Sequence, residues 1–318
     1  AATELDQVRG TLALLRLPGG ERYAREMLAL LGSLHSGARP YDEAALTLCC
    51  ASLRLSDYLD LLADGIADDP LLLLPALNEL RQARGEALYG EAELFAAQAV
   101  ACQWSVALPA DDGGLILPQL FDTGDAQSIA RRDLAAFQAA FLQWFKGIDS
   151  TAALAAMSHV ADQLAGTCSD ARLRTLWLAH ALLADTLRSR GSEPLPLELK
   201  RLVGRAGSQL KMLADQGEAA AVAQAGDTVW LLLHELSRNT AGHGRVQLLL
   251  DRVGLDRHLP SPDQLASLRR RFAGPGTAIT RLMHGEIRRE FGHAYDPVHG
   301  GADFVAHIGQ KIALRAAG

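Results

Sequence analysis

The sequence predicts an all-α protein built from two antiparallel helical bundles and a helical C-terminal extension. Hydrophobic residues make up 49% of the chain but aromatic residues only 5%, so leucine and alanine must fill the interior. This composition suits packed helices better than sheets. Apolar residues recur at helical spacing, and short polar turns separate these segments. A chain of 318 residues has room for two such bundles.

The first bundle is expected over residues 1–95. Its first helix has an inward face of four apolar residues at helical spacing, Leu5, Val8, Leu12 and Leu15. The PGG sequence at 18–20 ends that helix, and a second helix follows. Asp69 and Pro70 start the last helix of the bundle, because proline needs no amide donor at the first helical position. Gly85 is expected to end it.

The remaining chain divides into a linker, a second bundle and the extension. Residues 96–128 are expected to form the linker, because proline, glycine and aspartate interrupt any helical period there. Helical periodicity returns at Ile129, and the second bundle is expected over residues 129–258, with Trp177 and Trp230 in its core. Residues 259–318 form the helical extension, which the sequence FAGPGT interrupts.

Charge and motif content exclude several classes of function. The formal net charge is −6 and charges of both signs are interspersed, so the chain lacks the basic footprint of a nucleic-acid-binding protein. No apolar stretch is long enough to cross a bilayer, and we expect no direct membrane insertion. The sequence also lacks HExxH, GxxxxGK[ST], GxGxxG and GxSxG motifs. We therefore expect no metal site, no cofactor and no hydrolase chemistry.

Cysteine usage indicates the cellular compartment of the protein, and the first residues indicate whether the chain is part of a longer one. The four cysteines show neither CxxC spacing nor a disulfide framework, which favours a reducing cytoplasm. The chain begins with alanine and shows no signal-peptide pattern, so we expect a fragment of a longer protein.

The densest basic cluster, Arg269 to Arg271, is interpreted as a solvated helix end, with binding of an anionic partner as the alternative.

The first helix looks like a phosphorelay helix that has lost its phosphate acceptor. A histidine phosphotransfer helix carries an exposed histidine, followed by lysine and glycine about one turn later. This chain has Asp6, Arg9 and Gly10 there, with Gln7 and Ala13 on the same outer face. In the phosphotransfer reaction the imidazole attacks the phosphoryl group, the cation neutralises charge, and glycine lets a partner approach. Because Asp6 is a weak nucleophile, we predict a surface that binds a partner without catalysis.

Two alternatives stay open. Asp6 and Arg9 can be an ordinary exposed pair one turn apart, worth roughly a few tenths of a kcal/mol. Another histidine can also carry the phosphate: His159, in AAMSHVADQLAG, precedes a turn and a long helix, as a phosphotransfer histidine would. Asp162 and Gln163 occupy the lysine and glycine positions, however, so we expect an ordinary polar residue. His234 is expected on a buried helix face.

A longer resemblance favours the partner-binding interpretation. The stretches LDQVRGTLALLRLPGGERYAREMLALL and LLLLPALNELRQARGEALYGEAELF are similar to the N-terminal, phosphotransfer-like region of ChpA-type chemosensory kinases, which govern type IV pili. They resemble the related FimL family of pilus regulators more closely still. Later stretches, including SHVADQLAGTC and LLLHELSRNTAGHGRVQLLLDRVGLDRHLP, resemble the same proteins in the same order.

This resemblance implies histidine phosphotransfer-like bundles, of which the first, residues 1–95, is degenerate. It also implies a cytoplasmic scaffold protein that is located at the cell pole. The implied partners are a CheY-like response regulator and a polar FimV-type hub protein, with cyclic AMP-dependent virulence signalling and twitching motility downstream. It assigns no reaction to the chain.

Overall fold

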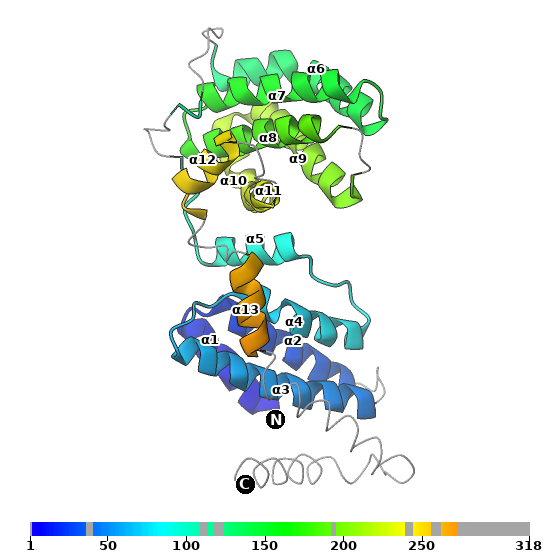
Figure 1. Ribbon diagram of the computed structural model, residues 1–318, viewed down its shortest axis with the longest axis vertical. Helices are drawn as coiled ribbons and strands as arrows, with labels where there is room; N and C mark the ends of the chain where they lie inside the picture. The colour runs from blue at the N-terminus through cyan, green and yellow to red at the C-terminus, as the bar shows by residue number, and fades with distance from the viewer. Residues whose placement is uncertain are drawn as a thin grey trace. The chain divides into compact units, whose positions relative to one another are not determined.

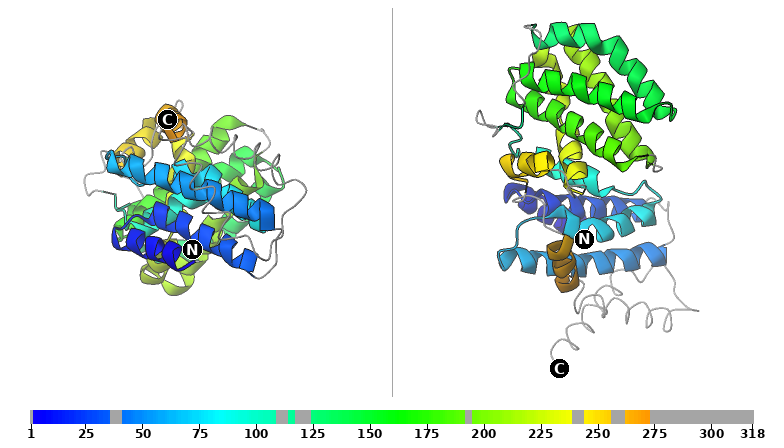
Figure 2. Two further views of the ribbon diagram at one scale, coloured as in Figure 1. Left: turned by 90° about the horizontal axis from the view of Figure 1, so that it is seen from below. Right: turned by 45° about the horizontal axis from the view of Figure 1, so that its top comes forward.

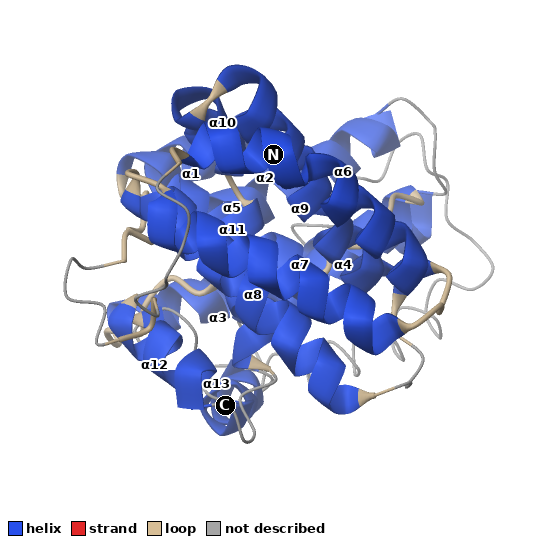
Figure 3. Ribbon diagram, turned by 90° about the horizontal axis from the view of Figure 1, so that it is seen from above, coloured by secondary structure: helices blue, strands red, loops and turns tan. Residues whose placement is uncertain are grey.

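The computed structural model describes residues 2–35, 41–108, 114–116, 124–191, 195–238, 244–255 and 262–272. All regular structure in these residues is helical and none of it is strand (Figure 3), which confirms the predicted all-α class. The described residues form two compact units, the first within residues 2–89 and 266–272 and the second within residues 90–265. None of the described helices is long and apolar enough to span a membrane.

Four successive helices build the first unit: α1 (Ala2–Leu14), α2 (Pro18–His35), α3 (Tyr41–Ala63) and α4 (Pro70–Arg84) (Figure 1). Helix α2 packs against the other three and is therefore the central helix. Its buried side chains include Tyr23, Met27 and Leu30. Helix α4 begins and ends as predicted, because Asp69 accepts a hydrogen bond from the Leu71 amide at 2.9 Å and Gly85 adopts a left-handed φ of 72°.

The N-terminus of α2 is capped by a residue distant in the sequence. Asp68 accepts hydrogen bonds from the amides of Gly19 at 2.8 Å and Gly20 at 3.2 Å, and from the Tyr58 hydroxyl at 2.6 Å. A Cβ atom at position 19 would lie 2.7 Å from the nearer Asp68 oxygen. The PGG sequence therefore forms the first turn of α2, where glycine lets the carboxylate reach otherwise unsatisfied amides.

The predicted inward face of α1 is wrong at two positions. Leu12 is buried, with 3% of its surface exposed, but Val8 is 37% exposed and Leu15 is 63% exposed. The cause is that α1 packs mainly on α2, a single neighbour. The line of contact runs through Leu5, Arg9 and Leu12, which is also a valid helical spacing. Apolar periodicity alone does not distinguish these two lines.

The second unit contains the remaining complete helices (Figure 2): α5 (Glu91–Ala101), α6 (Ala126–Phe145), α7 (Ser150–Thr167), α8 (Ala171–Arg190), α9 (Leu197–Gln216), α10 (Glu218–Ala225), α11 (Thr228–Ser237) and α12 (Gly244–Arg252). Helix α6 packs against α7 and α9, and α7 packs against α8. Helix α8 also packs against α11. Trp177 and Trp230 are buried in this unit, as predicted.

Helix α5 begins within the range expected for the first bundle and belongs to the second unit. An aromatic cluster joins it to α11: the ring centroid of Phe95 lies 6.0 Å from that of Trp230 and 5.5 Å from that of His234. Trp104 completes the cluster at 5.8 Å from Phe95. His234 is buried, as predicted, and burial lowers its pKa to about 4. Of the expected extension, only α13 (Pro262–Phe272) lies within the described residues.

Candidate partner-binding surface

The five residues predicted to bind a partner, Asp6, Gln7, Arg9, Gly10 and Ala13, all lie on α1, and we call them the α1 patch. Asp6, Gln7 and Ala13 are exposed, while Arg9 and Gly10 are half-buried. The Asp6 side chain points to solvent, with 60% of its surface exposed. The spacing of these residues along α1 therefore produces one continuous outer surface.

Arg9 connects this surface to α2. Its Nε atom lies 2.9 Å from Asp6 Oδ1, and its Nη1 atom lies 3.5 Å from Glu21 Oε1. Glu21 also pairs with Arg25 at 2.7 Å. Hydrogen bonding to Asp6, followed by the smaller effect of Glu21, raises the pKa of Arg9. The guanidinium is thus held by two carboxylates of the same unit, unlike a lysine kept ready for a phosphoryl group.

Gly10 leaves an opening in the α1 patch. A Cβ atom added there would meet no atom within 4 Å, so the fold itself does not require glycine at this position. One turn later lies Leu14, whose surface is 86% exposed. An opening beside an exposed apolar side chain can accept a side chain of a partner. The prediction from sequence missed Leu14, although its spacing from Gly10 places both residues on the same face.

The polar groups of the α1 patch are a carboxylate, a guanidinium and an amide. None of them is an imidazole, the group that carries phosphate in a phosphotransfer helix. Within the part of the chain that the structure describes, no three His, Cys, Asp or Glu side chains gather to hold a metal ion.

His159 lies exposed on α7 in the second unit. One turn along, Asp162 forms an ion pair with Arg245 of α12 at 3.2 Å, and Arg245 also donates to the Leu115 carbonyl oxygen at 2.9 Å. Burial raises the pKa of Asp162, while Arg245 and His159 act in the opposite direction. The position of the expected lysine is therefore occupied by an acid, and the nearby cation comes from a distant helix. Sequence spacing could not reveal Arg245.

Comparison with known proteins finds two similarities to the scaffold protein FimL. Residues 122–266 match the family model of the FimL scaffold protein second domain. The scaffold protein FimL of Pseudomonas aeruginosa is 28% identical over 302 residues, which cover 92% of this chain and 50% of that protein. This similarity to FimL runs along most of the present chain. It spans about half the length of this curated relative. No solved structure matches the chain.

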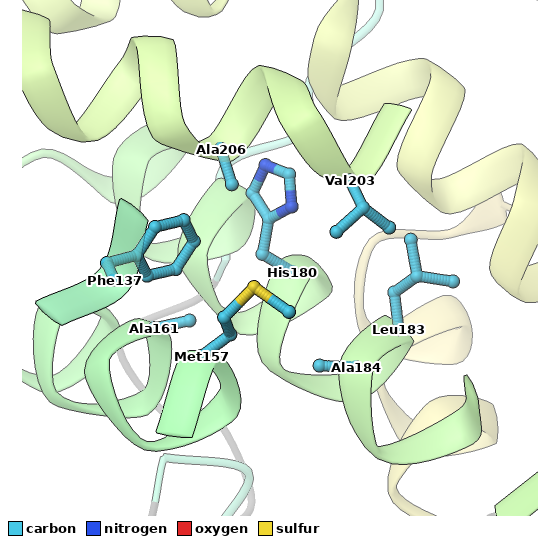
Figure 4. Close-up of a pocket in the computed structure, with 8 residues that line it drawn as sticks. All are labelled: Phe137, Met157, Ala161, His180, Leu183, Ala184, Val203 and Ala206. Carbon is cyan, nitrogen blue, oxygen red and sulfur yellow. The ribbon is translucent and has the colours of Figure 1, made fainter. Parts of the chain in front are cut away.

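Within the part that matches the FimL second domain, one cavity lies among α6, α7, α8 and α9 (Figure 4). It measures about 10 Å³ and is lined mainly by apolar side chains, including Phe137, Met157 and Val203. His180 also lines it, and its Nε2 atom has no hydrogen-bond partner among the described residues. Burial lowers the pKa of His180 to about 3. A space this small and apolar is a packing defect beside a neutral histidine.

The basic cluster near the end of the FimL-like chain is partly used by the fold. Arg269 donates from Nη2 to the Leu71 carbonyl oxygen of α4 at 3.1 Å. Arg270 is exposed, and the Arg271 side chain lies outside the described residues. Arg269 therefore holds α13 to the first unit and is less available to an anionic partner.

Proposed function

We propose that this chain is a non-catalytic scaffold and that its α1 patch binds a CheY-like receiver domain. The observation that carries the proposal is an outward surface with open space above Gly10 and no imidazole. A partner can approach such a helix closely, but it cannot transfer a phosphoryl group to it. The similar protein FimL of Pseudomonas aeruginosa is a scaffold protein by name, which supports the same role.

The wider role follows from the resemblance to pilus regulators. In this proposal the scaffold links a type IV pilus chemosensory pathway to a polar FimV-type hub protein, with cyclic AMP-dependent virulence signalling and twitching motility downstream. It acts in the cytoplasm at the cell pole. A receiver and a hub protein must then bind different surfaces, because a scaffold holds both at once.

Two substitutions at Gly10 test the α1 patch. Gly10→Trp fills the open space above the helix and is expected to weaken binding of a CheY-like receiver roughly tenfold or more. Gly10→Ala is the matched control, because a methyl group leaves most of the space open and should change the affinity little. Isothermal titration of the full chain with the receiver measures both. Equal affinities for wild type and Gly10→Trp would remove the α1 patch as the binding site.

The alternative function is active phosphotransfer through His159, and the exposure of this side chain favours testing it. The chain is incubated with a phosphorylated receiver, and acid-labile phosphate on the chain is then measured. We expect none above background, because Asp162 places negative charge where a cation should neutralise the phosphoryl group. Phosphate that disappears in His159→Gln would establish the alternative and overturn the non-catalytic assignment.

A further inference from the structure

Exposed apolar side chains gather at one end of the second unit. In the described part of residues 90–265, the large apolar side chains with substantial exposure are Val100, Leu142, Phe145, Ile148 and Leu197. All except Val100 lie near the end of α6 or the start of α9, and these two helices pack against each other. Isolated exposed apolar residues are ordinary, whereas a cluster marks an interaction surface. We call Leu142, Phe145, Ile148 and Leu197 the α6–α9 end patch.

The α6–α9 end patch is held in place by backbone structure. Gly147, with a left-handed φ of 74°, donates its amide to the Trp144 carbonyl oxygen at 2.9 Å. The Ile148 amide donates to the Gln143 carbonyl oxygen, also at 2.9 Å. These two bonds form a Schellman motif, which fixes Ile148 just beyond the end of α6. The patch is therefore preorganised, which lowers the entropic cost of binding.

Packing between α6 and α9 brings the end of α6 close to the first turns of α9. Lys200 Nζ lies 5.3 Å from the centroid of the Phe145 ring, and a Cβ atom at Gly204 would lie 3.1 Å from Phe141. Gly204 thus lets the two helices approach closely. Leu197 lies one turn before Lys200 and therefore on the same side of α9. Phe145 and Leu197 consequently border the seam between α6 and α9, and Leu142 and Ile148 lie three residues on either side of Phe145.

The charges around the seam are mainly positive, although the chain as a whole carries −6. Lys146, Lys200, Arg190 and Arg201 lie at this end of the unit and are exposed or half-buried. Two carboxylates also lie there. Asp149 caps α7 by accepting from the Ala152 amide at 3.3 Å, and Glu198 lies in the first turn of α9. Both carboxylates are at helix N-termini, where the helix dipole offsets their charge.

We propose that the α6–α9 end patch binds an acidic amphipathic helix of another protein. A seam between two helices accepts apolar residues that recur at helical spacing on a third helix. Carboxylates flanking those residues would face Lys146, Lys200 and Arg201, which gives charge complementarity. This surface lies in the second unit and does not depend on the α1 patch, so it gives the scaffold a second binding site.

A designed peptide tests this proposal directly. The probe is a fluorescent 21-residue helix, about the length of α6, with leucine on one face and glutamate on the other. A second peptide carries lysine in place of every glutamate. Fluorescence anisotropy with the 318-residue chain measures binding. We expect the acidic peptide to bind at least about tenfold more tightly than the basic one, and added salt to reduce the difference.

Variants of the chain then locate the site. Phe145→Glu and Lys200→Glu are each expected to weaken binding of the acidic peptide roughly tenfold. Leu197→Glu should do the same, and a carboxylate in the first turn of a helix favours folding. Its effect therefore cannot be ascribed to unfolding. Val100→Glu, the matched control elsewhere in the second unit, should bind as wild type does.

Three results would overturn the proposal. The first is equal affinity for the acidic and basic peptides, and the second is unchanged affinity in all three patch variants. The third is a chain that is dimeric in sedimentation equilibrium and becomes monomeric in Phe145→Glu, because the occupant would then be a second copy. Since Gly10→Trp leaves this patch intact, peptide binding in that variant separates this proposal from the one on α1.

Discussion

At the scale of single residues, burial decides what each histidine can do. His159 is exposed, whereas His180 and His234 are buried and have low pKa values of about 3 and about 4. The sequence could predict the burial of His234 from its apolar neighbours, LLLHELSR. It could not predict that His180 would line a cavity, because the lining comes from four helices.

The low pKa values make stability depend on pH. The ordinary histidine pKa is 6.5, so below that pH these two histidines bind protons in the unfolded chain but not in the folded chain. Stability is therefore fully present above about pH 6.5 and falls as the pH decreases, by about 1.4 kcal/mol per pH unit for each buried histidine. The fall continues until the folded pKa values are reached.

His180→Leu is expected to stabilise the second unit. Removing a buried nitrogen without a hydrogen-bond partner should raise the free energy of unfolding by about 1 kcal/mol at pH 7.5. Below pH 6.5, unfolding of the variant should take up about one proton fewer than unfolding of wild type. Urea unfolding followed by tryptophan fluorescence measures this, because Trp104, Trp144, Trp177 and Trp230 all lie in the second unit. His159→Leu, at an exposed position, is the control. A variant that unfolds more easily than wild type at pH 5 would contradict the account.

The α1 patch shows how far residues can be predicted from a sequence. Helical periodicity correctly placed Asp6, Gln7 and Ala13 on an exposed face. It could not show that Arg9 turns toward Glu21, since this contact depends on how α1 lies on α2. The same packing exposes Leu14 and Leu15, which a rule based on apolar spacing assigns to the interior or leaves unassigned.

At the scale of elements, local signals predicted helix ends, but contacts between distant residues decided helix packing. Asp69, Pro70 and Gly85 set the ends of α4 through residues beside them, so the sequence sufficed. The cap of α2 comes from Asp68, and no local pattern indicates that it reaches Gly19. The position of α5 likewise depends on its aromatic contacts with α11, which join residues far apart in the sequence.

Two glycines on adjacent helices should respond oppositely to alanine. Gly10→Ala meets open space within α1 and should stabilise that helix by about 0.5–1 kcal/mol. Gly19→Ala places a methyl group against Asp68 and should cost about 1–2 kcal/mol by displacing the cap of α2. Hydrogen exchange of peptides covering residues 2–14 and 18–35 measures each effect locally. The same direction of change in both variants would show that Asp68 does not govern α2.

At the scale of the whole molecule, the two units carry different surfaces. The first presents the α1 patch, and the second presents the α6–α9 end patch. The sequence predicted an all-α chain and a non-catalytic first helix from composition, spacing and resemblance. It did not predict the second surface, because exposure of Phe145 and Ile148 depends on how α6 ends against α9.

Two separate surfaces predict that their variants act independently. Gly10→Trp should reduce receiver binding and leave acidic-peptide binding unchanged, whereas Lys200→Glu should do the reverse. Because the two residues lie in separate units, their effects should be additive. For each ligand, the double variant should lose the sum of the binding free energies that the two single variants lose for that ligand. Anisotropy and calorimetry on the four proteins check this. Loss of both activities in either single variant would show that the surfaces are not independent.

We propose that the chain recognises a phosphorelay partner without receiving phosphate from it. Native mass spectrometry tests this most directly, because one spectrum of the chain mixed with a phosphorylated CheY-like receiver reports both the complex and any phosphate transferred. We predict a complex with the receiver and an unmodified mass for the chain. A phosphorylated chain whose added mass disappears in His159→Gln would show that the chain accepts phosphate through His159.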